Sequence, residues 1–162
     1  MRTGWHSRRD GVVQTNGGSM FTGVVWAEVL LPHADDVGVN RVTFAPGSRT
    51  VWHRHCGGQM LIGCAGSGLV VTHDGVQPIS EGIVVHAFAG ELHWHGALPD
   101  AFMSHTSIVL GGDTEWFEEV SEADYAPRLR IYLATVQPRA IADPFSILRA
   151  DVAWGADIPA YA

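Results

Sequence analysis

The sequence predicts an all-β fold, a sandwich or barrel of short strands. Apolar residues make up 46% of the 162 residues, which is enough for one buried core and too little chain for two full domains. Nineteen glycines and eight prolines indicate many tight turns. Apolar segments recur about every 8–12 residues with turn signals between them. No amphipathic segment is long enough for a helical bundle, so strands joined by turns are favoured.

The first half of the chain contains four of the expected strands. Residues 1–20 are polar and rich in glycine, and we expect a loose N-terminal arm there. The segments that follow are rich in β-branched or aromatic residues, and each ends at turn residues such as Pro32. These expected strands are 21–31, 39–47, 49–55 and 59–68.

The second half continues the same pattern up to an acidic segment. Residues 69–77 run into Asp74-Gly75, a strong hairpin signal, and further strands are expected within 81–97 and 101–112. Residues 113–126 are acidic, and Trp116, Phe117 and Val120 form an apolar stripe that predicts a short helix.

The domain limits follow from these elements. We expect one barrel domain over 21–125 and a C-terminal extension over 126–162. The extension would consist of a last strand at about 128–138 and a tail without clear periodicity.

Charge and composition exclude several partners. The net charge is −7 and no basic stripe is present, so we expect no nucleic-acid partner. The longest apolar runs fall far short of the roughly 18–20 residues that span a bilayer, and residues 1–11 lack the apolar core of a secretory signal.

The spacing of Cys56 and Cys64 fits neither a disulfide scaffold nor a CxxC site. A cytoplasmic protein with two reduced thiols is therefore expected.

The histidines are the most informative residues. Side chains two apart on a strand share a face, so His53 and His55 point the same way, as do His93 and His95. A turn containing two glycines follows His55 and returns the chain at Gln59. These segments can direct His53, His55, Gln59 and one of His93 and His95 into one cavity. Imidazole nitrogens and an amide oxygen suit Mn, Fe, Zn, Ni or Cu. The alternative is surface alternation on ordinary strands.

The spacing of the first histidine pair carries a family resemblance. The pattern Gly47-x5-His53-x-His55-x3-Gln59-x6-Gly66 resembles the first cupin motif in every spacing. Its one departure is Gln59, where most cupins carry glutamate.

The second cupin motif is matched with two departures. The pattern Gly82-x5-Phe88-x-Gly90-x2-His93 resembles it, with Phe88 in place of the usual proline and Ala97 where asparagine is common. The resemblance covers about residues 20–125. It implies a double-stranded β-helix, the cupin jelly-roll barrel, with one divalent metal ion. The implied metal ligands are His53, His55, Gln59 and His93.

A narrower likeness concerns the segment 93–97, HWHGA, and the histidines near it. Gln59, His95 and His105 are similar to positions in small bacterial cupins of the manganese-dependent hydroxynitrile lyase-like group. By type of site, cupin polyketide cyclases that hold zinc with histidines and a glutamine are a second relative. Residues 126–162 have no counterpart in this resemblance.

The amide ligand indicates which chemistry to expect. A carboxylate would lower the charge of the site by one, whereas Gln59 leaves the full +2 on the metal and makes it a stronger Lewis acid. The neutral amide also disfavours a trivalent metal, so acid–base chemistry is favoured over redox chemistry. We therefore favour Mn or Zn, with Fe or Ni as alternatives.

Two further histidines are expected to move protons. His95 shares a face with His93, and His105 lies on a neighbouring strand, so we predict that both are catalytic. The alternatives are that His95 is a fifth ligand and that His105 is a buried structural histidine. We expect His86, in an apolar strand, to be a core residue and Cys56 to be a turn residue.

The substrate-binding wall is predicted from two strand faces. One face precedes the first motif and the other flanks His105, and together they would line an apolar cavity for a small to medium organic substrate with an oxygen to offer the metal. The predicted lining residues are Asn40, Val42, Phe44, Met103, Ser107 and Val109. Trp52 and Trp94 alternate with the ligands and are expected on the opposite face.

Three functions fit these residues. The favoured one is a metal-dependent lyase or cyclase that uses Lewis-acid and proton-transfer chemistry on a carbonyl or hydroxyl substrate. A dioxygenase with the same ligands is the second, and a non-catalytic small-molecule-binding module is the third. A homodimer is expected, because an open sheet edge needs cover. The segment 128–136 is expected to supply that cover, either in its own subunit or in the partner.

Overall fold

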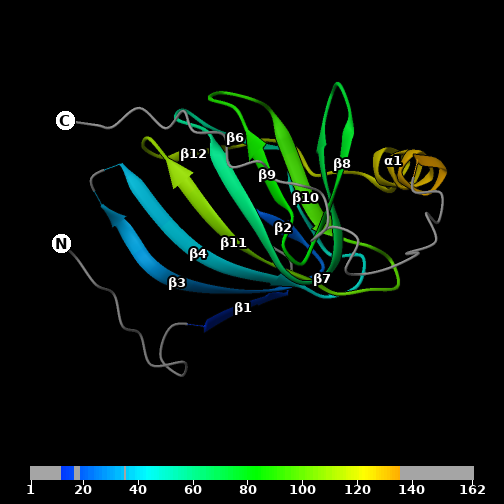
Figure 1. The fold of residues 1–162 in the computed structure, drawn as a ribbon, viewed down its shortest axis with the longest axis horizontal. Coiled ribbons are helices and arrows are strands. Elements are labelled where there is room, and N and C mark those ends of the chain that lie inside the picture. Colours follow the sequence, from blue (N-terminus) through cyan, green and yellow to red (C-terminus); the bar gives the residue numbers. More distant parts are fainter. Residues whose placement is uncertain (1–11, 17–18, 35, 136–162) are drawn as a thin grey trace, which may run out of the picture.

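The computed structural model describes residues 12–16, 19–34 and 36–135. Its strands form an antiparallel jelly roll in which two curved layers enclose the core (Figure 1). The strands are β1 (Val12–Asn16), β2 (Phe21–Thr22), β3 (Val24–Ala34), β4 (Val37–Phe44), β5 (Arg49–Thr50), β6 (His53–His55), β7 (Gln59–Thr72), β8 (Val76–Ser80), β9 (Val84–Ala87), β10 (His93–Ala97), β11 (Met103–Leu110) and β12 (Thr114–Trp116). One helix, α1 (Glu122–Thr135), follows them.

The long strand β7 belongs to both layers. Its first half pairs with β9 and β11, and its second half pairs with β8 and β10. Strands β3 and β4 extend the first layer beyond β11, and β6 continues the second layer beyond β10. Because β7 passes from one layer to the other, residues near its start lie beside residues of β11 and face residues of β6 and β10 across the barrel interior. The predicted all-β jelly roll is confirmed.

Two apolar clusters stabilise this arrangement. The first fills one end of the barrel between the layers and includes Val25, Phe44, Leu61, Ile79 and Met103. The second lies on the outer face of the second layer, where Trp52, Leu69, Val71 and Trp94 pack against Val120 and Tyr125. Trp52 and Trp94 thus face away from the neighbouring histidines, as the strand alternation predicts.

Two segments differ from the sequence-based expectations near the C-terminus. Thr114–Trp116, expected to be helical, forms β12 and pairs with β6, because the ladder bonds to β6 satisfy its backbone groups. The helix begins only after Ser121, whose hydroxyl accepts a 3.2 Å hydrogen bond from the Asp124 amide, as an N-cap does.

The last predicted strand is wrong over the described residues. The apolar residues of RLRIYLAT alternate, but Tyr125, Leu129 and Tyr132 share a helical face at i, i+4 and i+7 that packs on the second cluster. Figure 1 shows α1 beside β8 at one side of the barrel. Because a helix buries this face against the second cluster, the segment forms a helix instead of the predicted strand. The rest of the predicted tail lies outside the described residues.

The N-terminal expectation is also corrected in part. Residues 12–16 were assigned to a loose arm, but they form β1 and pair with residues 24–28 of β3. An added strand satisfies hydrogen bonds along an edge of the first layer that would otherwise stay open.

Candidate metal centre

Strand β6 and the turn after it present the first three polar side chains. His53 and His55 are buried, whereas Arg54 between them is exposed. The turn depends on Gly57, because a Cβ there would lie 2.6 Å from the Leu110 carbonyl oxygen. Gly58 has a φ of 89°, in the left-handed region that favours glycine, and it directs the chain back toward Gln59.

Strand β10 brings His93 opposite His53. The two residues are cross-strand partners, and their ring centroids are 4.3 Å apart. Ligand atoms of His53, His55 and His93 all lie within 4.8 Å of one another. The structure therefore brings His93, and not His95, into the three-histidine group.

The backbone presents two of these histidines to a metal. Nδ1 of His53 lies 3.0 Å from the Val51 carbonyl oxygen, and Nδ1 of His93 lies 2.8 Å from the Glu91 carbonyl oxygen. A carbonyl only accepts, so in both rings Nδ1 carries the proton and Nε2 keeps a lone pair. Such outer partners are typical of metal-binding histidines.

Gln59 completes the arrangement. Its amide nitrogen donates to the Ser107 hydroxyl at 2.8 Å, and its Oε1 lies 2.8 Å from Nε2 of His93. Since Nε2 of His93 carries a lone pair, two electron-rich atoms face each other, an arrangement that a cation between them stabilises. Two ligand atoms that each lie about 2.1 Å from one ion, at a right angle, would be about 3 Å apart. The 2.8 Å between Gln59 Oε1 and His93 Nε2 is close to that value.

The third histidine leaves an unpaired atom. Nε2 of His55 is buried and has no hydrogen-bond partner among the described residues. A buried polar atom without a partner is costly. The residues present therefore fit a divalent metal ion held by His53, His55, His93 and Gln59.

Burial keeps these imidazoles neutral. Desolvation and, to a smaller extent, the charge of a protonated His93 lower the pKa of His55 to about 4. Desolvation likewise lowers the pKa of His53 well below 6.5, and that of His93 below its ordinary value. At neutral pH the rings offer lone pairs to a cation rather than protons.

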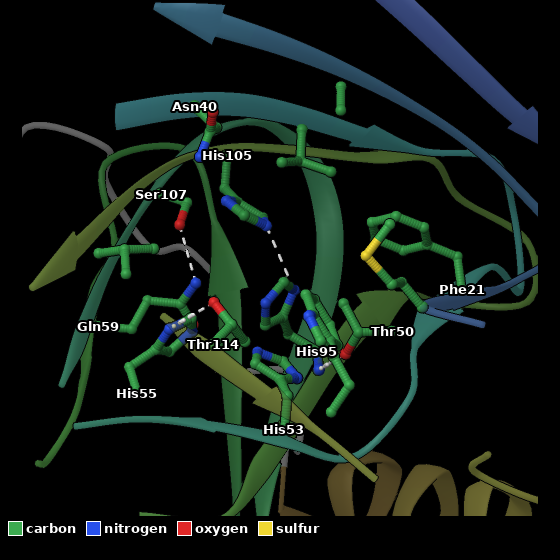
Figure 2. A pocket seen from close by; sticks show the side chains of 15 residues that line it. Phe21, Asn40, Thr50, His53, His55, Gln59, His95, His105, Ser107 and Thr114 are labelled. Atoms are coloured by element: carbon green, nitrogen blue, oxygen red, sulfur yellow. Dashed lines mark hydrogen bonds between the residues drawn. The ribbon is translucent and has the colours of Figure 1, made fainter. Parts of the chain in front are cut away.

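His95 and His105 form a second polar pair beside the first group. Nε2 of His105 lies 3.3 Å from Nδ1 of His95, and Figure 2 shows the two rings pointing toward each other in the pocket. Both residues are buried, and Phe44 stacks on the His105 ring at a centroid distance of 5.7 Å. Burial lowers the pKa of His105 to about 4 and that of His95 well below 6.5. One neutral imidazole donates and the other accepts.

A cavity of about 300 Å³ is lined by Gln59 and by four of these histidines, namely His53, His55, His95 and His105. Of the predicted wall, Asn40, Val42, Ser107 and Val109 line it. The remaining two, Phe44 and Met103, do not. They are cross-strand partners buried in the first apolar cluster, where they fill the barrel end behind the two histidines.

Six lining residues were not anticipated from the sequence: Met20, Phe21, Ala27, Thr50, Thr114 and Trp116. Trp116 lies over His53, with ring centroids 5.0 Å apart, and Phe21 meets Trp116 edge-on at 6.3 Å. Thr114 and Trp116 alternate as strand residues do, which was the available signal, but the acidic residues around them favoured a helix.

Among the described residues, His73, His86 and Cys56 stand apart from the cavity. His86 was expected in the core, but it is exposed and contacts Phe88. His73 stacks on Trp52 outside the barrel. Cys56 is an exposed turn residue, as expected, and its thiol contacts the Gly111 carbonyl.

Within residues 12–16, 19–34 and 36–135, no helix has the length and apolar character needed to cross a membrane.

Comparison with known proteins identifies relatives. No family model matches the chain. The (R)-mandelonitrile lyase of Granulicella tundricola is 41% identical over 111 residues, which span 65% of this chain and 85% of that protein.

Solved structures agree with the fold. A cupin-like protein from Thermotoga maritima superposes with a TM-score of 0.69 at 32% identity, covering 76% of this chain and 97% of its own. The polyketide cyclase RemF from Streptomyces resistomycificus superposes with a TM-score of 0.52 at 17% identity, covering 74% of this chain and 81% of its own. At that identity the likeness to RemF concerns the fold alone.

Proposed function

The chain belongs to the cupin family, and on that premise we propose that it is a metal-dependent lyase acting beside a hydroxyl or carbonyl group. The observation that carries the proposal is the His95–His105 contact in the cavity that His53 and His55 of the three-histidine group also line. A metal site and a neutral proton-transfer pair within one pocket are the parts that such a reaction needs.

His53, His55, His93 and Gln59 would hold the ion, with Mn or Zn favoured. When bound there, a divalent ion supplies Lewis acidity toward an alkoxide or carbonyl oxygen. The three imidazoles and the amide are all neutral, so they would not reduce the positive charge of the ion. This ligand set is the main support for acid–base chemistry over oxygen activation.

The proposed substrate is a small α-hydroxynitrile with an apolar or aromatic substituent. The relative named (R)-mandelonitrile lyase supports the reaction class. The lining residues Phe21, Val42, Val109 and Trp116 support an apolar substituent, and a 300 Å³ cavity suits a small organic molecule. Trp116 and Phe21 supply an aromatic wall beside the metal-facing rings.

The histidine pair would carry the proton through the reaction. One imidazole nitrogen takes the hydroxyl proton, the carbonyl double bond forms, and the carbon–carbon bond breaks with its electron pair on the departing cyanide carbon. The pair then returns the proton to cyanide. The products are an aldehyde and hydrogen cyanide, and the histidines end in their starting protonation state.

The test is cleavage of mandelonitrile by protein loaded with Mn²⁺ or Zn²⁺, followed by benzaldehyde release. Turnover that disappears on chelation and falls by roughly 10²–10⁴-fold in His105→Gln, with the metal content unchanged, supports the proposal. His86→Gln, an exposed histidine outside the cavity, is the matched control. Metal-loaded protein that cleaves no hydroxynitrile, or that consumes oxygen with diphenols or diketones, would contradict it and favour the dioxygenase.

We also propose that the protein is a cytoplasmic homodimer. Among the described strands β9 pairs only with β7, and Ile83, Val84 and Phe88 are exposed at or beside it. An apolar open edge of this kind favours association with a second copy. Light scattering that gives the mass of a monomer at micromolar concentration would refute the dimer.

A further inference from the structure

We infer that Thr114 is the positioning residue of His55, and that strand β12 thereby sets the metal affinity from outside the ligand set. The inference rests on the proposed metal site. It assigns a role to a residue that the cupin motifs do not contain, on a strand that follows both motifs.

Strand β12 lies against β6 in register with the two ligands. Thr114 is the cross-strand partner of His55, and Trp116 is the partner of His53. The Thr114 hydroxyl lies 3.0 Å from Nδ1 of His55, and Figure 2 shows this contact as a dashed line beside Gln59. Each histidine of β6 is thus covered by one side chain of β12.

The His55 contact differs in kind from the contacts of the other two histidines. His53 and His93 are held by the main-chain carbonyls of Val51 and Glu91, each only two residues earlier in the chain. His55 is held by a side chain 59 residues away. The orientation of this ring therefore depends on a group that substitution can remove.

The geometry also defines what Thr114 does for a bound ion. Nε2 of His55 is buried and has no hydrogen-bond partner among the described residues, so it is the atom of this ring that is left for the metal. A neutral imidazole that ligates through Nε2 carries its proton on Nδ1. The Thr114 hydroxyl oxygen is placed to accept a hydrogen bond from this Nδ1–H, which holds the ring plane and strengthens the ligand.

Strand β12 has anchors that do not involve the Thr114 hydroxyl. Backbone bonds join Trp52 to Phe117 and to Glu118 directly after the strand, at 2.8 and 3.1 Å. Arg54 pairs with Glu115 on the exposed face at 2.8 Å. Removing the hydroxyl should leave the strand in place and change only the support of His55.

The experiment is a competition between the protein and a chromophoric chelator for Zn²⁺ or Mn²⁺. Thr114→Val keeps the shape of the side chain and should raise the metal Kd by roughly 10–100-fold, while Thr114→Ser should restore it. Thr106→Val removes a hydroxyl that faces Cys64 outside the site and should change nothing, as should Glu115→Gln. Thermal unfolding of the metal-free variants checks that they fold, and Thr114→Ala replaces the valine variant if that one does not.

The outcomes separate the two proposals. Equal Kd values for wild type and Thr114→Val, or a serine variant as weak as the valine variant, overturn the role of Thr114 and leave the proposed function standing. A wild-type protein that takes up neither metal overturns the metal site itself.

Discussion

Gln59 and Ser107 are joined across strands β7 and β11 by a 2.8 Å hydrogen bond from the amide nitrogen to the hydroxyl oxygen. This bond turns the amide oxygen toward His93, the side on which an oxygen ligand is needed. Both side chains are buried. Ser107 thus supports a ligand and also forms part of the cavity wall.

Ser107→Ala should weaken metal binding by roughly 10-fold, because the amide nitrogen of Gln59 loses its buried acceptor and the ligand orientation is less constrained. Chelator competition measures the Kd. Ser104→Ala is the matched control, since Ser104 is on the same strand but its hydroxyl contacts Thr43. Equal losses of affinity in both variants would point to strand β11 as a whole rather than to the contact.

Gln59→Glu should bind the metal more tightly and turn over more slowly. A carboxylate ligand adds a negative charge, which attracts the cation but reduces its Lewis acidity toward an alkoxide. The paired measurement is the metal Kd and the rate of hydroxynitrile cleavage at saturating metal. A variant that is both tighter and faster would show that the neutral amide is not the reason for the activity.

The metal-free protein should lose stability as the pH falls from 6.5 to 4. Burial lowers the pKa of His105 to about 4, so in this window the unfolded chain binds a proton that the folded protein does not. Between pH 7 and pH 5, proton binding to His105 in the unfolded chain lowers the free energy of unfolding by about 2 kcal/mol. The other buried histidines act in the same direction.

Urea unfolding in the presence of a chelator, at pH 7 and at pH 5, measures that loss. His105→Gln cannot titrate and should lose about 2 kcal/mol less than wild type over the same interval. Identical losses in the two proteins would mean that folding does not lower the pKa of His105.

Arg49 should contribute more to stability than the residue with which it forms an ion pair. Its guanidinium is buried and donates twice to the Val120 carbonyl, at 2.8 and 3.1 Å, besides contacting Glu122. Arg49→Met leaves that carbonyl without a partner and should cost about 3 kcal/mol of unfolding free energy.

Glu122→Gln removes only the other end of the ion pair. The Glu122 side chain is 80% exposed, so the loss should stay below about 1 kcal/mol. Denaturant melts of both variants compare the two values. A larger loss in Glu122→Gln than in Arg49→Met would mean that the ion pair, and not the bonds from Arg49 to the Val120 carbonyl, is the main contribution of Arg49 to stability.

Much of the candidate site could be predicted because it is encoded by local periodicity. Side chains two apart on a strand share a face, so His53 and His55 had to point together, and the glycine turn had to return the chain at Gln59. Whether His93 or His95 joined them was left open by the residues themselves. The pairing of His93 with His53 decided it.

The errors had two causes: a segment in which strand and helix periodicities both fit, and a cavity whose extent along the strands alternation does not give. Residues 128–135 alternate like a strand, yet their helical face packs on Trp94 and its neighbours, and burial of that face decided the outcome. Phe44 and Met103 share the strand faces of Asn40 and Ser107, but they lie at the filled end of the barrel. Alternation predicts a face and does not tell how far along the barrel the cavity extends.

The sequence by itself determined the all-β class, the candidate ligands His53, His55 and Gln59, and the side of the strand on which each of them lies. Those features depend on spacings of a few residues. Only the tertiary structure decided that Ser107 supports Gln59, 48 residues away, and that Thr114 supports His55, 59 residues away. Such contacts are set by the register of distant strands, which depends on packing of the whole core and leaves no local pattern in the sequence.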